Sequence, residues 1–210
     1  MVQQHPYIVV AGVMGSGKTT IARILGEALG AHVFEEEFED NAFLERFYQD
    51  MARWALHCQL YFFSRKIKQA LLVKELLRRT PVVQDAPAGS DVYIYAKTLN
   101  ALGHLHDQEL SLLEDLFQLY EPQLPRPDLY ILVRISDELL AERIRERARS
   151  FEQGVTQEYL RGQKASFDEW AARFPKERVF EIAQDSVDIQ NRPADREVFL
   201  NNVTQALQAR

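Results

Sequence analysis

Near its N-terminus the chain reads Tyr7-Ile8-Val9-Val10-Ala11-Gly12-Val13-Met14-Gly15-Ser16-Gly17-Lys18-Thr19-Thr20. The β-branched run over 7–11 predicts a buried strand, and apolar residues at helical spacing over 20–29 predict a helix. Between them, residues 12–19 match the pattern G-x-x-x-x-G-K-[ST], in which backbone N–H groups and the helix N-terminus face phosphate oxygens. We therefore expect a nucleoside triphosphate to bind here. The expected phosphate-binding residues are Gly12, Val13, Met14, Gly15, Ser16, Gly17, Lys18, Thr19 and Thr20.

The rest of the chain alternates short apolar runs with segments of helix length. Further strands are predicted over 31–34, 81–84, 128–133 and 179–182, and helices over 41–79, 91–102, 107–119, 137–149, 157–173 and 195–207. Such alternation requires crossover connections, which predicts an α/β fold: a five-stranded, mostly parallel sheet with helices on both faces. Residues 1–210 fit the usual size of one domain, so we expect a single P-loop domain.

Composition excludes several classes of protein. The chain has 25 Lys and Arg against 31 Asp and Glu, which gives a net charge of -6. A negative net charge argues against a protein whose main role is to bind a nucleic acid polymer. Cys58 is the only cysteine, so no intramolecular disulfide can form, and it is expected in the core. No signal peptide is visible, and no apolar run reaches the roughly twenty residues of a membrane span. We expect a cytoplasmic protein with no membrane partner.

Acidic residues follow two of the predicted strands. Phe34-Glu35-Glu36-Glu37-Phe38-Glu39-Asp40 comes after the second strand and Asp85 ends the third, where the carboxyl ends of strands border the ligand crevice. One acid of the first run is either a catalytic carboxylate that orients an acceptor hydroxyl or part of a solvated loop. Asp85, with Thr19, is a candidate ligand of Mg²⁺. A phosphate loop alone leaves GTPases, ATPase motors and small-molecule kinases open, and the chain's size favours a kinase.

Four arginines gather at the end of the fifth predicted helix, in Arg143-Ile144-Arg145-Glu146-Arg147-Ala148-Arg149. Arg143 and Arg147 share one helix face, and Arg145 and Arg149 share another. The cluster is either a solvated surface helix with cations near its C-terminus or a closing lid over about 143–156 that brings guanidinium groups to the transferred phosphoryl. Beside a triphosphate site the lid is the favoured interpretation.

Together these features resemble the deoxynucleoside kinase family over nearly the whole chain. The most specific match is Arg143-x-x-x-Arg147-Ala148-Arg149-x-x-Glu152-Gln153-Gly154, followed by Glu158-Tyr159-Leu160. A second match is Phe47-Tyr48-Gln49-Asp50, Arg53-Trp54 and Gln59-Leu60-Tyr61. The segment Glu36-x-x-Glu39-Asp40-Asn41-Ala42-Phe43-Leu44 resembles the bacterial deoxyadenosine and deoxyguanosine kinase branch, which favours a purine substrate.

The resemblance implies transfer of the γ-phosphoryl of ATP, or another NTP, to the 5′-hydroxyl of a deoxynucleoside in nucleotide salvage, with Mg²⁺ and as a homodimer. The catalytic residues it implies are Glu36, Asp85, Arg143, Arg147 and Arg149. The substrate-binding residues it implies are Glu36 for the 5′-hydroxyl, Tyr48 and Glu152 for the 3′-hydroxyl, and Gln59 and Asp91 for the base. Thr19 and Asp85 are the implied metal ligands.

The chain departs from the family at Asp85-Ala86-Pro87, where the family pattern has Asp or Glu, then Arg-Ser. The residues that could supply the missing charge are Arg145, Arg65 and Lys66, although a regular helix would turn Arg145 away from Arg143 and Arg147. The departure leaves two alternatives beside the deoxynucleoside kinase. One is a kinase for a related nucleoside or nucleotide, and the other is a catalytically impaired nucleotide-binding regulatory protein.

Overall fold

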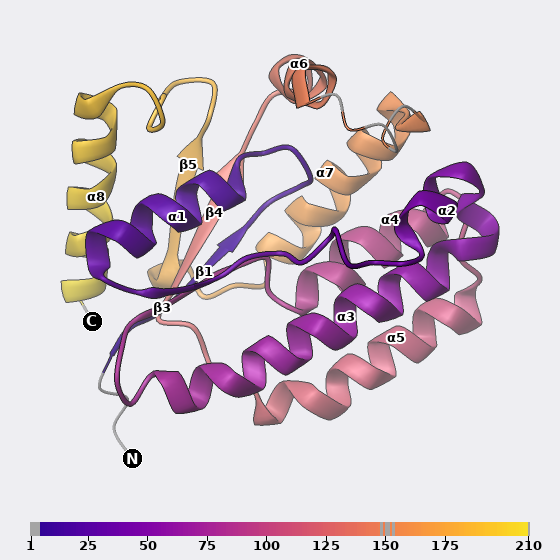
Figure 1. Cartoon of the computed structure of the whole chain (residues 1–210), viewed down its shortest axis with the longest axis horizontal. Coiled ribbons are helices and arrows are strands. Elements are labelled where there is room, and N and C mark those ends of the chain that lie inside the picture. The colour runs from indigo at the N-terminus through magenta and orange to yellow at the C-terminus, as the bar shows by residue number, and fades with distance from the viewer. Residues whose placement is uncertain (1–4, 148, 150–151, 153, 210) are drawn as a thin grey trace.

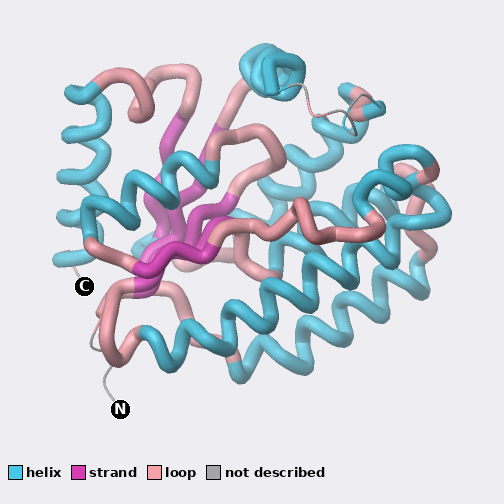
Figure 2. Tube along the Cα trace, in the orientation of Figure 1, coloured by secondary structure: helices cyan, strands magenta, loops and turns pink. Residues whose placement is uncertain are grey.

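The computed structural model describes residues 5–147, 149, 152 and 154–209. Its sheet has five strands in the order β2-β3-β1-β4-β5, and all four neighbouring pairs are parallel. Figure 2 shows the strands gathered together with helices around them. The strands are β1 (Tyr7–Ala11), β2 (His32–Phe34), β3 (Val82–Asp85), β4 (Leu129–Arg134) and β5 (Val179–Ala183). This confirms the predicted α/β fold, with a sheet that is parallel throughout.

Helices cover both faces of the sheet (Figure 1). The α-helices are α1 (Lys18–Leu29), α2 (Leu44–Gln49), α3 (Met51–Leu76), α4 (Lys97–Ala101), α5 (Asp107–Tyr120), α6 (Asp137–Arg147), α7 (Gln157–Ala171) and α8 (Pro193–Gln208). A π-helical segment, η1 (Asp91–Ala96), precedes α4, and short 3-10 turns lie at η2 (Glu121–Gln123) and η4 (Lys176–Arg178). In the described part of the chain, no helix is long and apolar enough to cross a membrane.

The core explains why β1 is an unbroken apolar run. Ile8 and Val10 pack in a cluster with side chains of α1 and α8, whereas Tyr7 and Val9 pack on the opposite face with Val73 of α3. Every residue of β1 is buried. A central strand covered on both faces has no need of alternating polar residues.

Two predicted helices are divided in the structure. The predicted helix over 41–79 separates into α2 and α3 at Asp50, whose side chain accepts a hydrogen bond from Arg53 N at 3.1 Å and so caps α3. The predicted helix over 91–102 begins with the π-helical turns of η1, a feature that often marks functional sites. Asp91 stands at the first position of η1, next to the carboxyl ends of the strands.

Candidate active site

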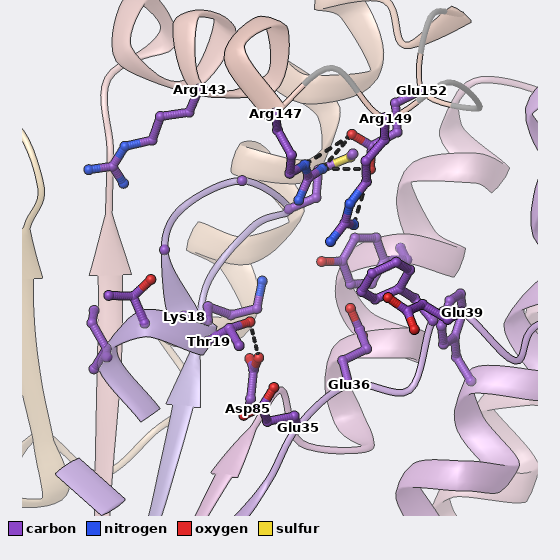
Figure 3. Close-up of a pocket in the computed structure, with 18 of the residues that line it drawn as sticks. Lys18, Thr19, Glu35, Glu36, Glu39, Asp85, Arg143, Arg147, Arg149 and Glu152 are labelled. Atoms are coloured by element: carbon purple, nitrogen blue, oxygen red, sulfur yellow. Dashed lines mark hydrogen bonds and ion pairs between the residues drawn. The ribbon is translucent and has the colours of Figure 1, made fainter. Parts of the chain in front are cut away.

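A cavity of about 750 Å³ opens at the carboxyl ends of the parallel strands. Its walls come from the phosphate loop, the 35–40 loop after β2, helices α2 and α3, η1, the arginine-rich end of α6, and the chain after β5 (Figure 3). The expected site residues that line it are Met14, Gly15, Gly17, Lys18, Thr19, Thr20, Glu36, Tyr48, Gln59, Asp85, Asp91, Arg143, Arg147, Arg149 and Glu152. The chain therefore brings residues more than a hundred positions apart into one cavity.

The phosphate loop takes the backbone conformation that its glycines permit. Gly15 and Gly17 have φ of 75° and 93°, in the left-handed region that favours glycine. Lys18 is buried, and its Nζ donates to the carbonyl of Val13 at 2.9 Å. Burial lowers the pKa of Lys18, while Asp85 and Glu36 act in the opposite direction. Gly12, Val13 and Ser16 do not line the cavity, and Val13 contributes its backbone carbonyl instead.

Thr19 and Asp85 form the candidate metal site. Thr19 Oγ1 donates to Asp85 Oδ2 at 2.5 Å, and the other carboxylate oxygen, Oδ1, is buried without a hydrogen-bond partner. Burial raises the pKa of Asp85, and the nearby Lys18 opposes this. No group of three or more His, Cys, Asp or Glu in the described residues could hold a metal ion. A divalent cation here would therefore also need oxygens from phosphate or water.

Glu36 is the acid of the 35–40 loop that contacts a buried cation. Its Oε1 lies 2.7 Å from Lys66 Nζ, with side chains 27% and 3% exposed respectively. Burial raises the pKa of Glu36, but Lys66 and Lys18 outweigh it and hold the pKa below its ordinary value. Glu35 pairs instead with the exposed Arg23. The structure thus separates one interior carboxylate from the solvated acids beside it.

Gln59 and Asp91 face the cavity from α3 and η1. Both side chains are buried, and both keep one oxygen, Gln59 Oε1 and Asp91 Oδ2, without a hydrogen-bond partner. The second oxygen of Asp91 accepts from Lys66 Nζ at 2.7 Å. Buried acceptors without a donor are costly, and a ligand in the cavity that both residues line could supply one.

Glu152 is held by two arginines of the predicted lid. Arg147 donates through Nε to Oε2 at 3.1 Å and through Nη2 to Oε1 at 2.5 Å, and Arg149 Nη1 lies 3.5 Å from Oε1. The guanidinium of Arg149 also lies 3.7 Å from the ring centre of Phe38. Burial raises the pKa of Tyr48, and Tyr159 and Glu152 contribute. The lid positions 148, 150, 151 and 153 lie outside the described residues.

Arg143 points to the phosphate loop rather than to Glu152 (Figure 3). Its Nη1 donates to the carbonyl of Ser16 at 3.1 Å and its Nη2 to Gln184 Oε1 at 2.8 Å. Arg145 is exposed and is not among the cavity-lining residues, as helical spacing predicts. Three of the four arginines therefore reach the cavity.

Sequence reasoning missed part of the cavity wall. Gln184 follows β5 directly, and Asp188, Ile189, Gln190 and Asn191 come soon after it. The rule that pointed to the acids of residues 35–40 and to Asp85 could have found Gln184, because it too stands at the carboxyl end of a parallel strand. The sequence indicates Lys66 only as one possible replacement for a missing charge, because nothing in its helix marks it as buried.

Comparisons with known proteins agree with this geometry. The family model described as "Deoxynucleoside kinase" matches residues 8–208. A deoxyadenosine/deoxycytidine kinase of Bacillus subtilis (strain 168) is 28% identical over 192 residues, which cover 90% of this chain and 88% of that protein. A deoxyadenosine kinase of Dictyostelium discoideum is 33% identical over 164 residues, covering 78% of this chain and 66% of that protein.

Solved structures share the fold. The structure of deoxyadenosine kinase from M. mycoides with bound dCTP superposes with a TM-score of 0.80 at 23% identity, covering 95% of this chain and 99% of that chain. The same enzyme with bound dATP gives a TM-score of 0.80 at 22% identity, over 94% of this chain and 99% of that chain. At this level of identity, the likeness establishes the arrangement of the sheet and helices.

Proposed function

This chain belongs to the deoxynucleoside kinase family, and from that premise we propose that it transfers the γ-phosphoryl of ATP, or another nucleoside triphosphate, to the 5′-hydroxyl of a purine deoxynucleoside in nucleotide salvage. Membership makes it a phosphotransferase that acts on deoxynucleosides. The observation that carries the finer proposal is Glu36, an interior carboxylate that faces the cavity across from Lys18 (Figure 3).

In the proposed reaction Glu36 accepts the proton of the 5′-hydroxyl as that oxygen attacks the γ-phosphorus. The new O5′–P bond forms while the bond from the γ-phosphorus to the bridging oxygen breaks, so that a deoxynucleoside 5′-monophosphate and a nucleoside diphosphate are released. Lys18, Arg147 and Arg149 line the cavity where negative charge develops on the transferred group. Arg143, bonded to Ser16, holds the lid helix against the phosphate loop.

Mg²⁺ is the cation that this chain's oxygen donors fit. Asp85 Oδ1 is a buried, unpartnered carboxylate oxygen next to the Thr19 hydroxyl, and hard oxygen donors of this kind suit Mg²⁺ together with substrate phosphates. When bound, Mg²⁺ would supply positive charge to the donor phosphates. Asp85 and Thr19 are the residues that would hold it.

The preference for a purine rests on the resemblance of residues 36–44 to the bacterial deoxyadenosine and deoxyguanosine kinase branch, and the preference for a base with an exocyclic amine rests on Asp91. Asp91 lines the cavity and its Oδ2 has no hydrogen-bond donor, so the exocyclic amine of a bound base can donate to it, whereas a carbonyl oxygen at the same place would be repelled. We place the sugar 3′-hydroxyl between Tyr48 and Glu152, which line the cavity on the lid side. Relatives named deoxyadenosine kinase fit this preference.

Three further expectations belong to the same proposal. We propose a homodimer, because α3 and α5 lie side by side and carry exposed leucines at Leu71, Leu72, Leu112 and Leu119 (Figure 1). A Leu72→Glu variant should then sediment as a monomer in analytical ultracentrifugation, where the wild type sediments as a dimer. The proposal also includes a single kinase domain over residues 1–210, with a lid at about 143–156. It includes a cytoplasmic location as well.

The test is a phosphoryl-transfer assay with ATP and Mg²⁺ across deoxyadenosine, deoxyguanosine, deoxycytidine and thymidine, beside Lys18→Ala. We expect turnover of deoxyadenosine above the other three and none with Lys18→Ala. Binding of ATP without turnover of any acceptor would contradict the proposal and point to a regulatory nucleotide-binding protein.

A further inference from the structure

Lys66 is the buried cation of α3, and it lies behind the cavity wall rather than on it. Its side chain is 3% exposed and it is absent from the residues that line the cavity, although Glu36 and Asp91 both line it. An ammonium that does not reach the cavity surface cannot contact a substrate there. Any influence of Lys66 on the reaction must pass through the side chains that it holds.

All donor directions of the Lys66 ammonium are occupied. Its Nζ lies 2.7 Å from Glu36 Oε1, 2.7 Å from Asp91 Oδ1 and 3.4 Å from Ser90 Oγ. A lysine ammonium has three N–H donors and no acceptor, so these three contacts use its whole capacity. The two short contacts go to carboxylates from different elements, the 35–40 loop and η1.

Without a cation between them, Glu36 and Asp91 would repel each other. Asp91 is buried and Glu36 is partly buried beside it, and two carboxylates that share one ammonium at 2.7 Å are necessarily close. The segment 85–87, which adjoins this cluster through Asp85, reads Asp-Ala-Pro and supplies no positive charge. Ala86 there has a φ of 57°, and its N–H bonds to the carbonyl of Val10. Lys66 is therefore the cation that contacts both carboxylates directly, while Lys18 adds positive charge near Glu36.

We propose that Lys66 is a positioning residue that joins the two halves of the acceptor site, fixing the reacting carboxylate Glu36 and the base-reading carboxylate Asp91 with one shared ammonium. The proposal rests on the proposed kinase function. A change at one carboxylate therefore alters the position of the other. Losing the ammonium displaces Glu36 because Asp91 then repels it, and neutralising Asp91 as well removes that repulsion.

The experiment measures kcat and the acceptor KM with deoxyadenosine, ATP and Mg²⁺ for Lys66→Gln, Lys66→Arg, Asp91→Asn and the double variant Lys66→Gln with Asp91→Asn. Lys68→Gln is the matched control, because Lys68 lies on the same helix and is exposed. ATP binding, measured by calorimetry, establishes that each variant is folded. If Lys66→Gln alone fails to fold, the double variant still tests the proposal, because the double variant leaves no unpaired buried carboxylate at position 91.

We expect Lys66→Gln to lose about a hundredfold in kcat, the effect of misplacing a reacting group by about 1 Å, with ATP binding retained. Lys66→Arg should recover most of that loss, Asp91→Asn should chiefly raise the acceptor KM, and the double variant should exceed Lys66→Gln in kcat. A wild-type kcat in Lys66→Gln, or losses in the double variant equal to the product of the single losses, would overturn the inference while leaving the kinase intact. An inactive wild type would overturn the proposed function and this inference with it.

Discussion

Replacing Arg147 with Met should weaken both the lid and the reaction. Arg147 donates through two nitrogens to Glu152, whose side chain is 4% exposed, while its own is 29% exposed. Removing one partner of a fully buried ion pair costs about 3–5 kcal/mol. Because Arg147 is partly hydrated and Arg149 still reaches Glu152, we expect about 2 kcal/mol, and hence a Tm lower by about 4–8 °C for a chain of this length.

Arg147→Met should cost more free energy in transition-state stabilisation than in folding stability. Removing one preorganised donor from developing negative charge typically costs about 100- to 1000-fold in kcat. The assay compares kcat and Tm of Arg147→Met with Arg145→Met, because Arg145 lies two residues away on the same helix but is exposed and outside the cavity. Equal kcat losses in the two variants, or an unchanged Tm in Arg147→Met, would refute the reasoning.

Three further perturbations follow from the cavity. Burial raises the pKa of Glu36, but Lys66 and Lys18 outweigh this effect and hold the pKa low. Lys66→Gln should therefore raise the pKa of Glu36 and move the acid limb of the kcat/KM profile to higher pH. An acid limb that stays at the same pH would contradict this. Burial raises the pKa of the Cys58 thiol to about 12, so a thiol reagent at mildly alkaline pH should label Cys58 only after the protein is denatured. Rapid labelling of the native protein would contradict the burial of Cys58. Phe38→Leu removes the ring that contacts the Arg149 guanidinium, and with it about 1 kcal/mol of cation–π energy. This loss should raise the KM for ATP about fivefold. An unchanged KM for ATP would show that this contact does not hold the lid.

The fold was predictable because its signals are local. The apolar run of β1 and the glycine pattern after it specify a strand, a phosphate loop and a helix in that order, and β1 lies at Tyr7–Ala11 as predicted. The rule that strand ends border the crevice predicted that the acids of residues 35–40 and Asp85 lie near the phosphate loop, and the family resemblance then singled out Glu36. Both inferences need only short stretches of sequence.

What could not be predicted depends on contacts between distant segments. Lys66 lies in a helix whose sequence does not separate buried from exposed lysines, and its burial follows from carboxylates 30 residues before it and 25 after it. The π-helical turns at 91–96 and the separation of α2 from α3 at Asp50 likewise carry no periodic signal. Among the four clustered arginines, helical spacing placed Arg145 and Arg149 on one face, and this was wrong for Arg149, which lies beyond the end of α6 at Arg147 and lines the cavity. The spacing also did not show that Arg143 binds the phosphate loop.

The central claim is that Glu36 takes the proton from the acceptor hydroxyl, and Glu36→Gln tests it most directly. The substitution keeps the shape of the side chain and removes its basicity. In a deoxyadenosine assay with ATP and Mg²⁺, we predict that kcat falls by about 100-fold or more, as expected for loss of a general base, while calorimetric binding of ATP and of deoxyadenosine is kept. A Glu36→Gln enzyme that turns over deoxyadenosine at the wild-type kcat would contradict the claim.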